Sequence, residues 1–148
     1  MNATTLDVTL PDGSVRTLPA GSTGLDLAQS IGSRLAKAAL AAVVNGNEVD
    51  ISVPLSNGAQ VAIITADSDA GRHVLRHSTA HVLAQAVLQH FPGAKFTIGP
   101  AIEDGFYYDF ELPDNKTFSD NDLAAITERM RAIVKADQQF VRAEMSAA

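Results

Sequence analysis

Two histidines four residues apart are the side chains of this sequence whose type and spacing best suit chemistry. His77 and His81 stand within a run from residue 71 to about residue 90 that has helical periodicity. With about 3.6 residues per turn, positions i and i+4 lie one above the other, about 40° apart around the helix axis. The sequence therefore predicts that both imidazoles share one face of a helix.

The apolar residues of the same run form a separate stripe, made of Leu75, Val82, Leu83, Ala86 and Val87. On a helical wheel the two histidines lie about 120° or more from the middle of this stripe. We therefore expect the histidines to face solvent, a cleft or another segment rather than the core.

Three interpretations of the pair remain open from spacing alone. As metal ligands they lack the glutamate that follows the first histidine of zinc proteases, because Ser78 stands there, and a third ligand would have to come from elsewhere. As acid/base or water-positioning groups they need only suitable geometry and a pKa near neutrality. The third interpretation is two solvent-exposed histidines without a chemical role.

Composition limits the classes of function. The chain has 148 residues, enough for one medium domain or two small ones, and no cysteine, which excludes disulfides and thiolate sites within it. No apolar run approaches the roughly 18 residues that span a membrane, and the first ten residues lack signal-peptide features, so we expect a cytoplasmic protein without a membrane partner. The net charge is −6 and neither half is basic, which argues against DNA as a partner and predicts weak RNA binding by the chain alone.

The first 65 residues alternate short strands with one main helix. A strand over 5–10, the turn of residues 11–14 and a strand over 15–18 predict a hairpin. A helix capped by Ser22 or Thr23, with Asp26 in its first turn, is expected to end at Gly32, followed by one or two helical turns over 35–40. Strands are expected over 42–44, 48–50 and 60–65, with Asn45-Gly46 as a two-residue hairpin turn. This ββαββ order with a final strand fits a small β-grasp, ubiquitin-like domain of the α+β class.

The rest of the chain also predicts α+β structure. Residues 67–72 are small and polar and are interpreted as a linker. The histidine helix should end at Pro92-Gly93, followed by a strand over 95–98, a kink at Gly99-Pro100, a turn over 103–105, an aromatic strand over 106–110 and a loop over 113–116. A helix from the N-cap Ser119 to about residue 137 carries the apolar stripe Leu123, Ile126, Met130, Ile133 and Val134, and residues 140–145 suggest one more strand.

Strand alternation places Tyr108 on the same face as Phe106 and Phe110, for which a place in the core is the preferred interpretation. The pattern of alternation therefore does not single out Tyr108 as a site residue.

Several short motifs occur together in a familiar order. Residues 76–81, then Ile98-Gly99-Pro100 and residues 105–109, resemble the start of the editing domain of the bacterial threonyl-tRNA synthetase family. Residues 9–14, 35–38, 44–46 and 63–66 resemble the amino-terminal TGS domain of the same family. Each motif is weak alone, but their collinearity over nearly the whole chain makes the resemblance specific.

The resemblance implies a β-grasp TGS domain over 1–66, a linker over 67–72 and the first part of the editing domain over 73–148. The editing domain of this family hydrolyses serine wrongly esterified to threonine tRNA. Serine lacks one methyl group of threonine, which supplies only about 1–3 kcal/mol of discrimination, so a second sieve is required. By this analogy His77 and His81 are the catalytic pair that positions water or acts as acid and base, and Tyr108 and Gly99 bind substrate.

The resemblance also predicts a fragment of a longer ligase. The family completes its editing pocket with a later Cys-x-x-x-His segment, so the isolated chain is expected to be inactive. ATP, Mg²⁺ and a catalytic zinc are expected in the aminoacylation domain, with no metal or cofactor in this fragment, threonine tRNA as partner and a homodimeric parent. The alternatives are a free-standing TGS-type interaction module for RNA or protein, and a small metallohydrolase using the two histidines.

Overall fold

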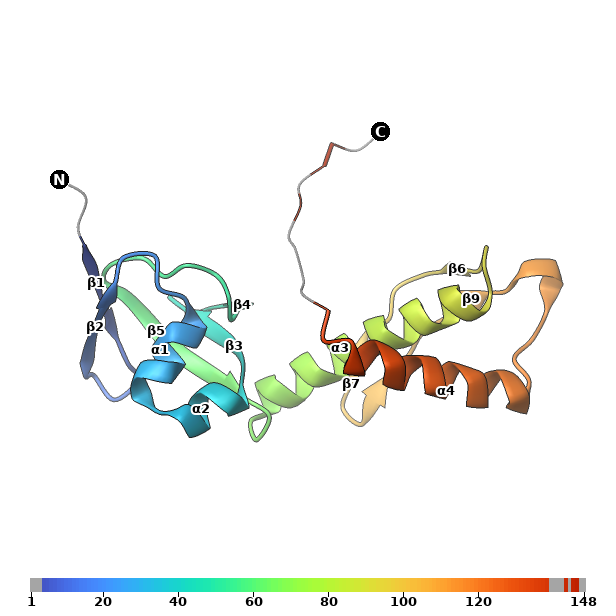
Figure 1. The fold of residues 1–148 in the computed structure, drawn as a ribbon, viewed down its shortest axis with the longest axis horizontal. Helices are drawn as coiled ribbons and strands as arrows, with labels where there is room; N and C mark the ends of the chain where they lie inside the picture. The colour runs from blue at the N-terminus through green and yellow to red at the C-terminus, as the bar shows by residue number, and fades with distance from the viewer. Residues whose placement is uncertain (1–3, 139–142, 144, 147–148) are drawn as a thin grey trace. The chain divides into compact units, whose positions relative to one another are not determined.

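The computed structural model describes residues 4–138, 143, 145 and 146, and the chain divides into two compact units (Figure 1). These units are Met1–Leu75 and Arg76–Ala148, and each has its own hydrophobic cluster. The division falls inside a helix, nine residues after the domain end predicted at residue 66.

The first unit is built on one five-stranded sheet in the order β2-β1-β5-β3-β4. Its strands are β1 (Thr5–Thr9), β2 (Val15–Pro19), β3 (Ala39–Val44), β4 (Asn47–Asp50) and β5 (Ala59–Thr65). β1 and β5 pair in parallel at the centre, and the other neighbouring strands are antiparallel. This mixed sheet with a helix between its two hairpins confirms the predicted α+β class and is consistent with a β-grasp domain.

Helix α1 (Gly24–Ile31) begins where the sequence predicts. Thr23 is the N-cap, and its hydroxyl and the Asp26 carboxylate form a reciprocal capping box. The helix ends at Gly32, after which α2 (Ser33–Ala38) follows directly. The core of the unit joins Leu27 of α1 to apolar residues of the sheet and of the loop before β5, namely Leu6, Val8, Leu18, Ala42, Leu55, Ala59 and Val61.

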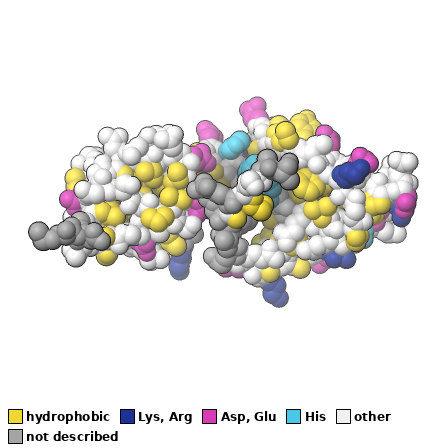
Figure 2. Space-filling view, turned by 90° about the horizontal axis from the view of Figure 1, so that it is seen from above, with side chains coloured by type: hydrophobic (Ala, Val, Ile, Leu, Met, Phe, Trp, Pro, Cys, Tyr) yellow, Lys and Arg dark blue, Asp and Glu magenta, His cyan; other side chains and the backbone are white. Residues whose placement is uncertain are grey.

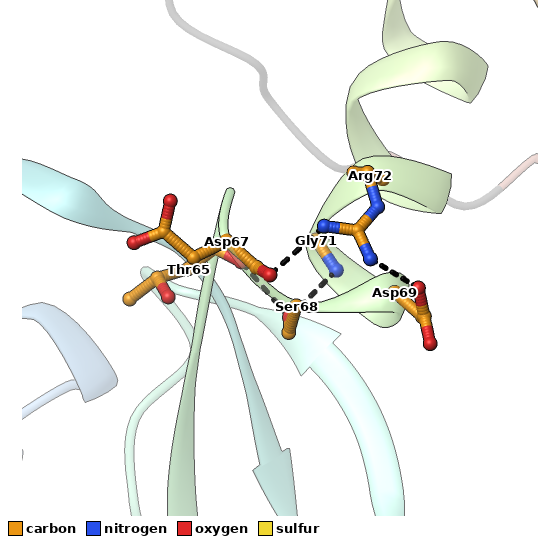
Figure 3. A network of polar contacts seen from close by, with 6 residues as sticks. All are labelled: Thr65, Asp67, Ser68, Asp69, Gly71 and Arg72. Carbon is orange, nitrogen blue, oxygen red and sulfur yellow. Dashed lines mark hydrogen bonds and ion pairs between the residues drawn. The ribbon is translucent and has the colours of Figure 1, made fainter.

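Helix α3 (Asp69–His90) begins inside the predicted linker, so residues 69–72 are helical and the linker interpretation is wrong there. Ser68 acts as the N-cap, because its Oγ accepts the Gly71 N–H at 3.0 Å. Ser68 Oγ also donates to the Thr65 carbonyl at 2.9 Å, at the end of β5 (Figure 3). Arg72 donates to the Asp67 carbonyl at 2.9 Å and forms an ion pair with Asp69.

Gly71 makes this junction sterically possible. A Cβ atom at this position would lie 1.9 Å from the Thr65 carbonyl oxygen and 2.6 Å from its carbon. Both atoms belong to the backbone and cannot rotate away. The first turn of α3 therefore packs against the end of β5 more closely than any side chain at position 71 would allow.

The second unit combines most of α3 with helix α4 (Asp120–Lys135) and two small sheets. The sheets pair β6 (Lys95–Phe96) with β9 (Phe110–Glu111), and β7 (Ala101–Ile102) with β8 (Gly105–Phe106). A short 3₁₀ turn, η1 (Pro113–Asn115), precedes α4. The core contains Ala86, Val87, Ala94, Leu112 and Ile126.

Two predicted strands of this unit differ in the structure. The aromatic strand expected over 106–110 is split into β8 and β9, which pair in two different sheets. The strand expected over 95–98 is only the two residues of β6, and the expected kink region leads into β7, which sequence reasoning missed. The strand expected over 140–145 falls mostly on residues outside the described ones.

Helix α4 is capped by Ser119, as predicted, and Asp122 completes its capping box. Of the predicted apolar stripe, Ile126 is buried and Met130 and Ile133 pack against the core. Leu123 and Val134 are wrong as core residues, since they are 53% and 68% exposed. The other three belong to the same hydrophobic cluster as Ala86 and Val87 of α3.

Asp122 also joins the start of α4 to the end of α3. Its Oδ1 lies 2.8 Å from His90 Nε2, and its Oδ2 accepts the Ser119 hydroxyl at 2.5 Å. Hydrogen bonds from the Ser119 side chain, from His90 and from the Ser119 backbone lower the pKa of Asp122 from 3.8 to about 2. The ionised carboxylate is thus favoured by the folded state.

We expect Asp122→Asn to lower the stability of the second unit at neutral pH. Because the folded-state pKa lies below the unfolded value, the carboxylate stabilises the fold above pH 3.8 and loses this contribution as the pH falls through about 2. Both tyrosines of the chain, Tyr107 and Tyr108, lie in this unit, so thermal unfolding followed by tyrosine fluorescence reports on it.

The difference in melting temperature between Asp122→Asn and the unaltered chain should disappear between pH 4 and pH 2, which is the range between the two pKa values. Asp120→Asn is the matched control, since it removes a carboxylate from the same turn that is not part of the capping box. A gap in melting temperature that persists undiminished at pH 2 would contradict the assignment.

Candidate functional site

The structure brings the two predicted catalytic histidines together on an exposed face of α3. His77 Nε2 and His81 Nε2 lie 3.1 Å apart, and the rings meet edge to face with centroids separated by 4.6 Å. Both residues are exposed, and histidine side chains reach the molecular surface in Figure 2. The prediction that the pair avoids the core is confirmed.

Four small or apolar residues of α3 are buried. Ala80, Ala84, Ala86 and Val87 are buried, at 1%, 5%, 0% and 1% exposure. The predicted stripe was therefore right for its last members but wrong for Leu75, which is 42% exposed. Ala80 and Ala84 lie three residues after His77 and His81, so the buried part of α3 extends beyond the predicted stripe toward the histidine pair.

The histidine pair has a defined hydrogen-bonding requirement. A bond between two Nε2 atoms needs one nitrogen to carry the proton and the other to present its lone pair. The two imidazoles thus provide an N–H donor and a bare nitrogen within 3.1 Å of each other. When this bond opens, the bare nitrogen can take up a proton and the imidazolium so formed can return one, which is the requirement of general acid–base chemistry.

Metal binding by the pair would need further ligands. Zinc sites use at least three protein ligands, and two nitrogens from one helix are short of that number. Within the described residues no group of three or more histidine, aspartate or glutamate side chains is arranged to hold a metal ion.

Gly99 and Tyr108, the two predicted substrate-binding residues, are in direct contact. A Cβ atom on Gly99 would lie 2.2 Å from Cδ2 and from Cε2 of the Tyr108 ring. The ring also stacks on Phe110, with centroids 4.9 Å apart and planes 16° from parallel, and leans on Phe96 at 5.9 Å. Only a glycine at position 99 lets the backbone lie against this ring.

Phe96 is a contact of Tyr108 that sequence reasoning did not single out. Its ring is 49% exposed although it belongs to β6, and it extends the aromatic surface formed by Tyr108 and Phe110. The pairing of β6 with β9 brings it there, and no local sequence signal reveals that pairing. Among residues 4–138, no hydrogen bond, ion pair or ring contact connects the histidine pair with Gly99 or Tyr108.

The fold and the sequence of the first unit define a known class of domain. Residues 6–65 match the family model of the TGS domain, which agrees with the mixed sheet and its single main helix. No helix of the described residues is both long and apolar enough to cross a membrane.

The whole chain is similar to threonine–tRNA ligases. It is 53% identical over 143 residues to the enzyme of Citrifermentans bemidjiense, which covers 97% of this chain and 22% of that protein. It is 55% identical over 137 residues to the enzyme of Maricaulis maris, covering 93% of this chain and 21% of that one. The similarity to the amino-terminal part of bacterial threonine–tRNA ligases confirms the predicted resemblance.

The aligned region covers nearly all of this chain but only a small part of its relatives. The threonine–tRNA ligase of Desulforamulus reducens shows the same proportions, with 48% identity over 95% of this chain and 22% of the relative. The chain thus spans about a fifth of the length of these proteins. The similarity extends well past the TGS domain and includes the segment that carries His77, His81, Gly99 and Tyr108.

Proposed function

We propose that this chain is the amino-terminal part of a threonine–tRNA ligase and that its second unit contributes to hydrolysis of serine wrongly attached to threonine tRNA. The observation that carries the proposal is the Nε2–Nε2 hydrogen bond between His77 and His81, in a chain about half identical to such ligases. On this proposal threonine tRNA is the substrate partner.

The chemistry of the step suits this pair of imidazoles. A water oxygen adds to the ester carbonyl carbon and loses a proton, and the bond to the ribose oxygen then breaks as that oxygen gains a proton. Once the hydrogen bond between the two rings opens, the bare Nε2 of one histidine takes the first proton, and the imidazolium so formed returns a proton to the ribose oxygen while its neighbour positions the water. Either histidine fills either role, because the hydrogen bond between them is symmetrical in its atoms.

Tyr108 and Gly99 are the proposed substrate-binding residues. The tyrosine ring packs against the Gly99 backbone and stacks on Phe110, and these contacts fix its position before substrate arrives. A fixed wall distinguishes serine from threonine by excluding one methyl group, which a mobile side chain would not do.

The remaining expectations belong to the longer protein. ATP, Mg²⁺ and a catalytic zinc are proposed for its aminoacylation part, and a homodimeric state and a cytoplasmic location are proposed for the whole protein. A free-standing TGS-type interaction module is the less favoured alternative, because the similarity to the ligases continues far beyond residues 6–65, which match the TGS domain.

Grafting tests the proposal directly. This chain would replace the matching amino-terminal region of the Citrifermentans bemidjiense ligase, which is 53% identical to it. The hybrid should release serine from mischarged threonine tRNA, whereas the same ligase without any such region should not. A hybrid that charges threonine normally but never releases serine would contradict the proposed function.

A further inference from the structure

Two Asn-Gly steps occur in exposed turns of the first unit. Asn45-Gly46 joins β3 to β4, and Asn57-Gly58 immediately precedes β5. The absence of a Cβ on the following glycine leaves its backbone nitrogen unhindered for attack on the preceding side-chain amide. All four residues are exposed, so neither sequence nor exposure distinguishes the two steps.

The two asparagine side chains also make equivalent hydrogen bonds. Asn45 Oδ1 accepts the Gln60 N–H at 2.9 Å, and Asn57 Oδ1 accepts the Asp7 N–H at 2.8 Å. In each case a backbone N–H polarises the side-chain carbonyl, which favours addition of a nucleophile at Cγ. The side-chain carbonyls of Asn45 and Asn57 are therefore activated to the same extent.

The glycine nitrogens that would attack these carbonyls differ in their hydrogen bonding. The Gly58 N–H donates to the Asp7 carbonyl at 2.7 Å, so the nitrogen that would attack Asn57 is already engaged. Within residues 4–138 the Gly46 N–H has no such acceptor. Asn45 and Gly46 both have positive φ, 50° and 83°, which is the turn geometry that leaves this N–H directed to solvent.

Solvent also reaches the Asn45 step from the side of the sheet. Gly46 and Gln60 line a surface groove of about 400 Å³ that runs past the end of β1. Water and hydroxide thus have access to Gly46 from the groove, and Asn45 is itself exposed. Attack on Asn57 would instead require the bond between Gly58 and Asp7 to break first.

We propose that Asn45 is a site of spontaneous deamidation and that the fold protects Asn57. The Gly46 nitrogen forms a bond to Asn45 Cγ, the bond from Cγ to Nδ2 breaks, and ammonia leaves with the proton from the Gly46 N–H. Water then opens the resulting five-membered imide at either carbonyl, giving aspartate or isoaspartate at position 45. No oxidant, metal or enzyme takes part.

The two products differ in their effect on the sheet. Aspartate keeps an oxygen for the Gln60 N–H and adds one negative charge to a chain of net charge −6. Isoaspartate adds a methylene to the main chain inside a two-residue turn whose flanking residues, Val44 and Asn47, are paired. It therefore disturbs the register of β3 and β4, whereas aspartate leaves that register intact.

Incubation of the full chain in mildly alkaline buffer tests the proposal, with mass spectrometry to locate the gain of about one mass unit. Both asparagines fall in the same tryptic peptide, residues 38–72, so fragment ions assign the site. We expect Asn45 to convert about fivefold to tenfold faster than Asn57, the factor that one ordinary hydrogen bond contributes.

The unfolded chain is the internal control. In denaturant the two steps should convert at similar rates, because each asparagine is followed by glycine. Asn45→Gln should remove most of the signal from the folded protein and Asn57→Gln little of it, with circular dichroism confirming that both variants fold. Equal rates in the folded chain, faster conversion at Asn57, or a folded Asn45 that survives while the unfolded one converts would each overturn the proposal.

Discussion

In a threonine–tRNA ligase carrying this chain as its amino-terminal region, replacing His77 and His81 together by alanine should slow the release of serine from threonine tRNA by about 10²–10⁴-fold. That range is the usual contribution of a positioned acid–base group. The pair supplies a donor nitrogen and an acceptor nitrogen 3.1 Å apart, and alanine removes both. The measurement is the single-turnover rate of serine release from purified, mischarged tRNA.

Stability and threonine charging should hardly change in the same variant. Both side chains are exposed, and exposed helix substitutions usually change the free energy of unfolding by less than about 0.5 kcal/mol. His73 provides a matched control, because it is exposed on the same helix one turn earlier and His73→Ala should retain full serine release. If serine release survives the double substitution while the melting temperature falls, the histidines are structural and the proposed role is wrong.

Gly71→Ala should destabilise the first unit by about 1–3 kcal/mol, the usual cost of forcing extra volume into a packed site. In an unobstructed helix the same change would stabilise by roughly 0.5–1 kcal/mol, because alanine is the better helix former. The sign of the change in the free energy of unfolding therefore shows which of the two effects is larger. A Cβ only 1.9 Å from the Thr65 carbonyl oxygen makes the destabilising one dominate.

The measurement is urea unfolding followed by far-ultraviolet circular dichroism, since the first unit contains no tyrosine or phenylalanine. Gly32→Ala serves as the control, because a Cβ there meets nothing within 4 Å and the backbone lies outside the left-handed region. Hydrogen exchange at Gly71 and Arg72 should accelerate as the first turn of α3 loosens. An alanine variant more stable than the unaltered chain would show that the close approach to Thr65 is not maintained in solution.

Local signals predicted the fold wherever the determining contacts are local. The capping boxes of Thr23 with Asp26 and of Ser119 with Asp122 span three residues each, and the sequence placed both helix starts correctly. The turn at Asn45-Gly46 is likewise set by two residues with positive φ. The shared face of His77 and His81 follows from helical spacing, so that part of the candidate site was also predictable.

The predictions that were wrong depend on contacts between segments that are far apart in the sequence. Residues 106–110 look like one strand, but Phe106 pairs with Ala101 and Phe110 with Phe96, in different sheets. Alternation along the sequence carries no information about which partner each residue has. The contact of Gly99 with Tyr108 depends on the same arrangement, so the resemblance could assign both to substrate binding while spacing could not show that they touch.

The contact between the start of α3 and the end of β5 determines where the first domain can be separated or exchanged. The matched TGS segment ends at residue 65, yet Ser68 donates to the Thr65 carbonyl at the end of β5, and Gly71 and Arg72 in turn donate to Ser68 and to the Asp67 carbonyl. A piece cut after residue 66 would expose the Thr65 carbonyl and lose the cap that starts the next helix. Recombination between related ligases is therefore better tolerated after Leu75, where the compact unit ends, than at the edge of the recognisable motif.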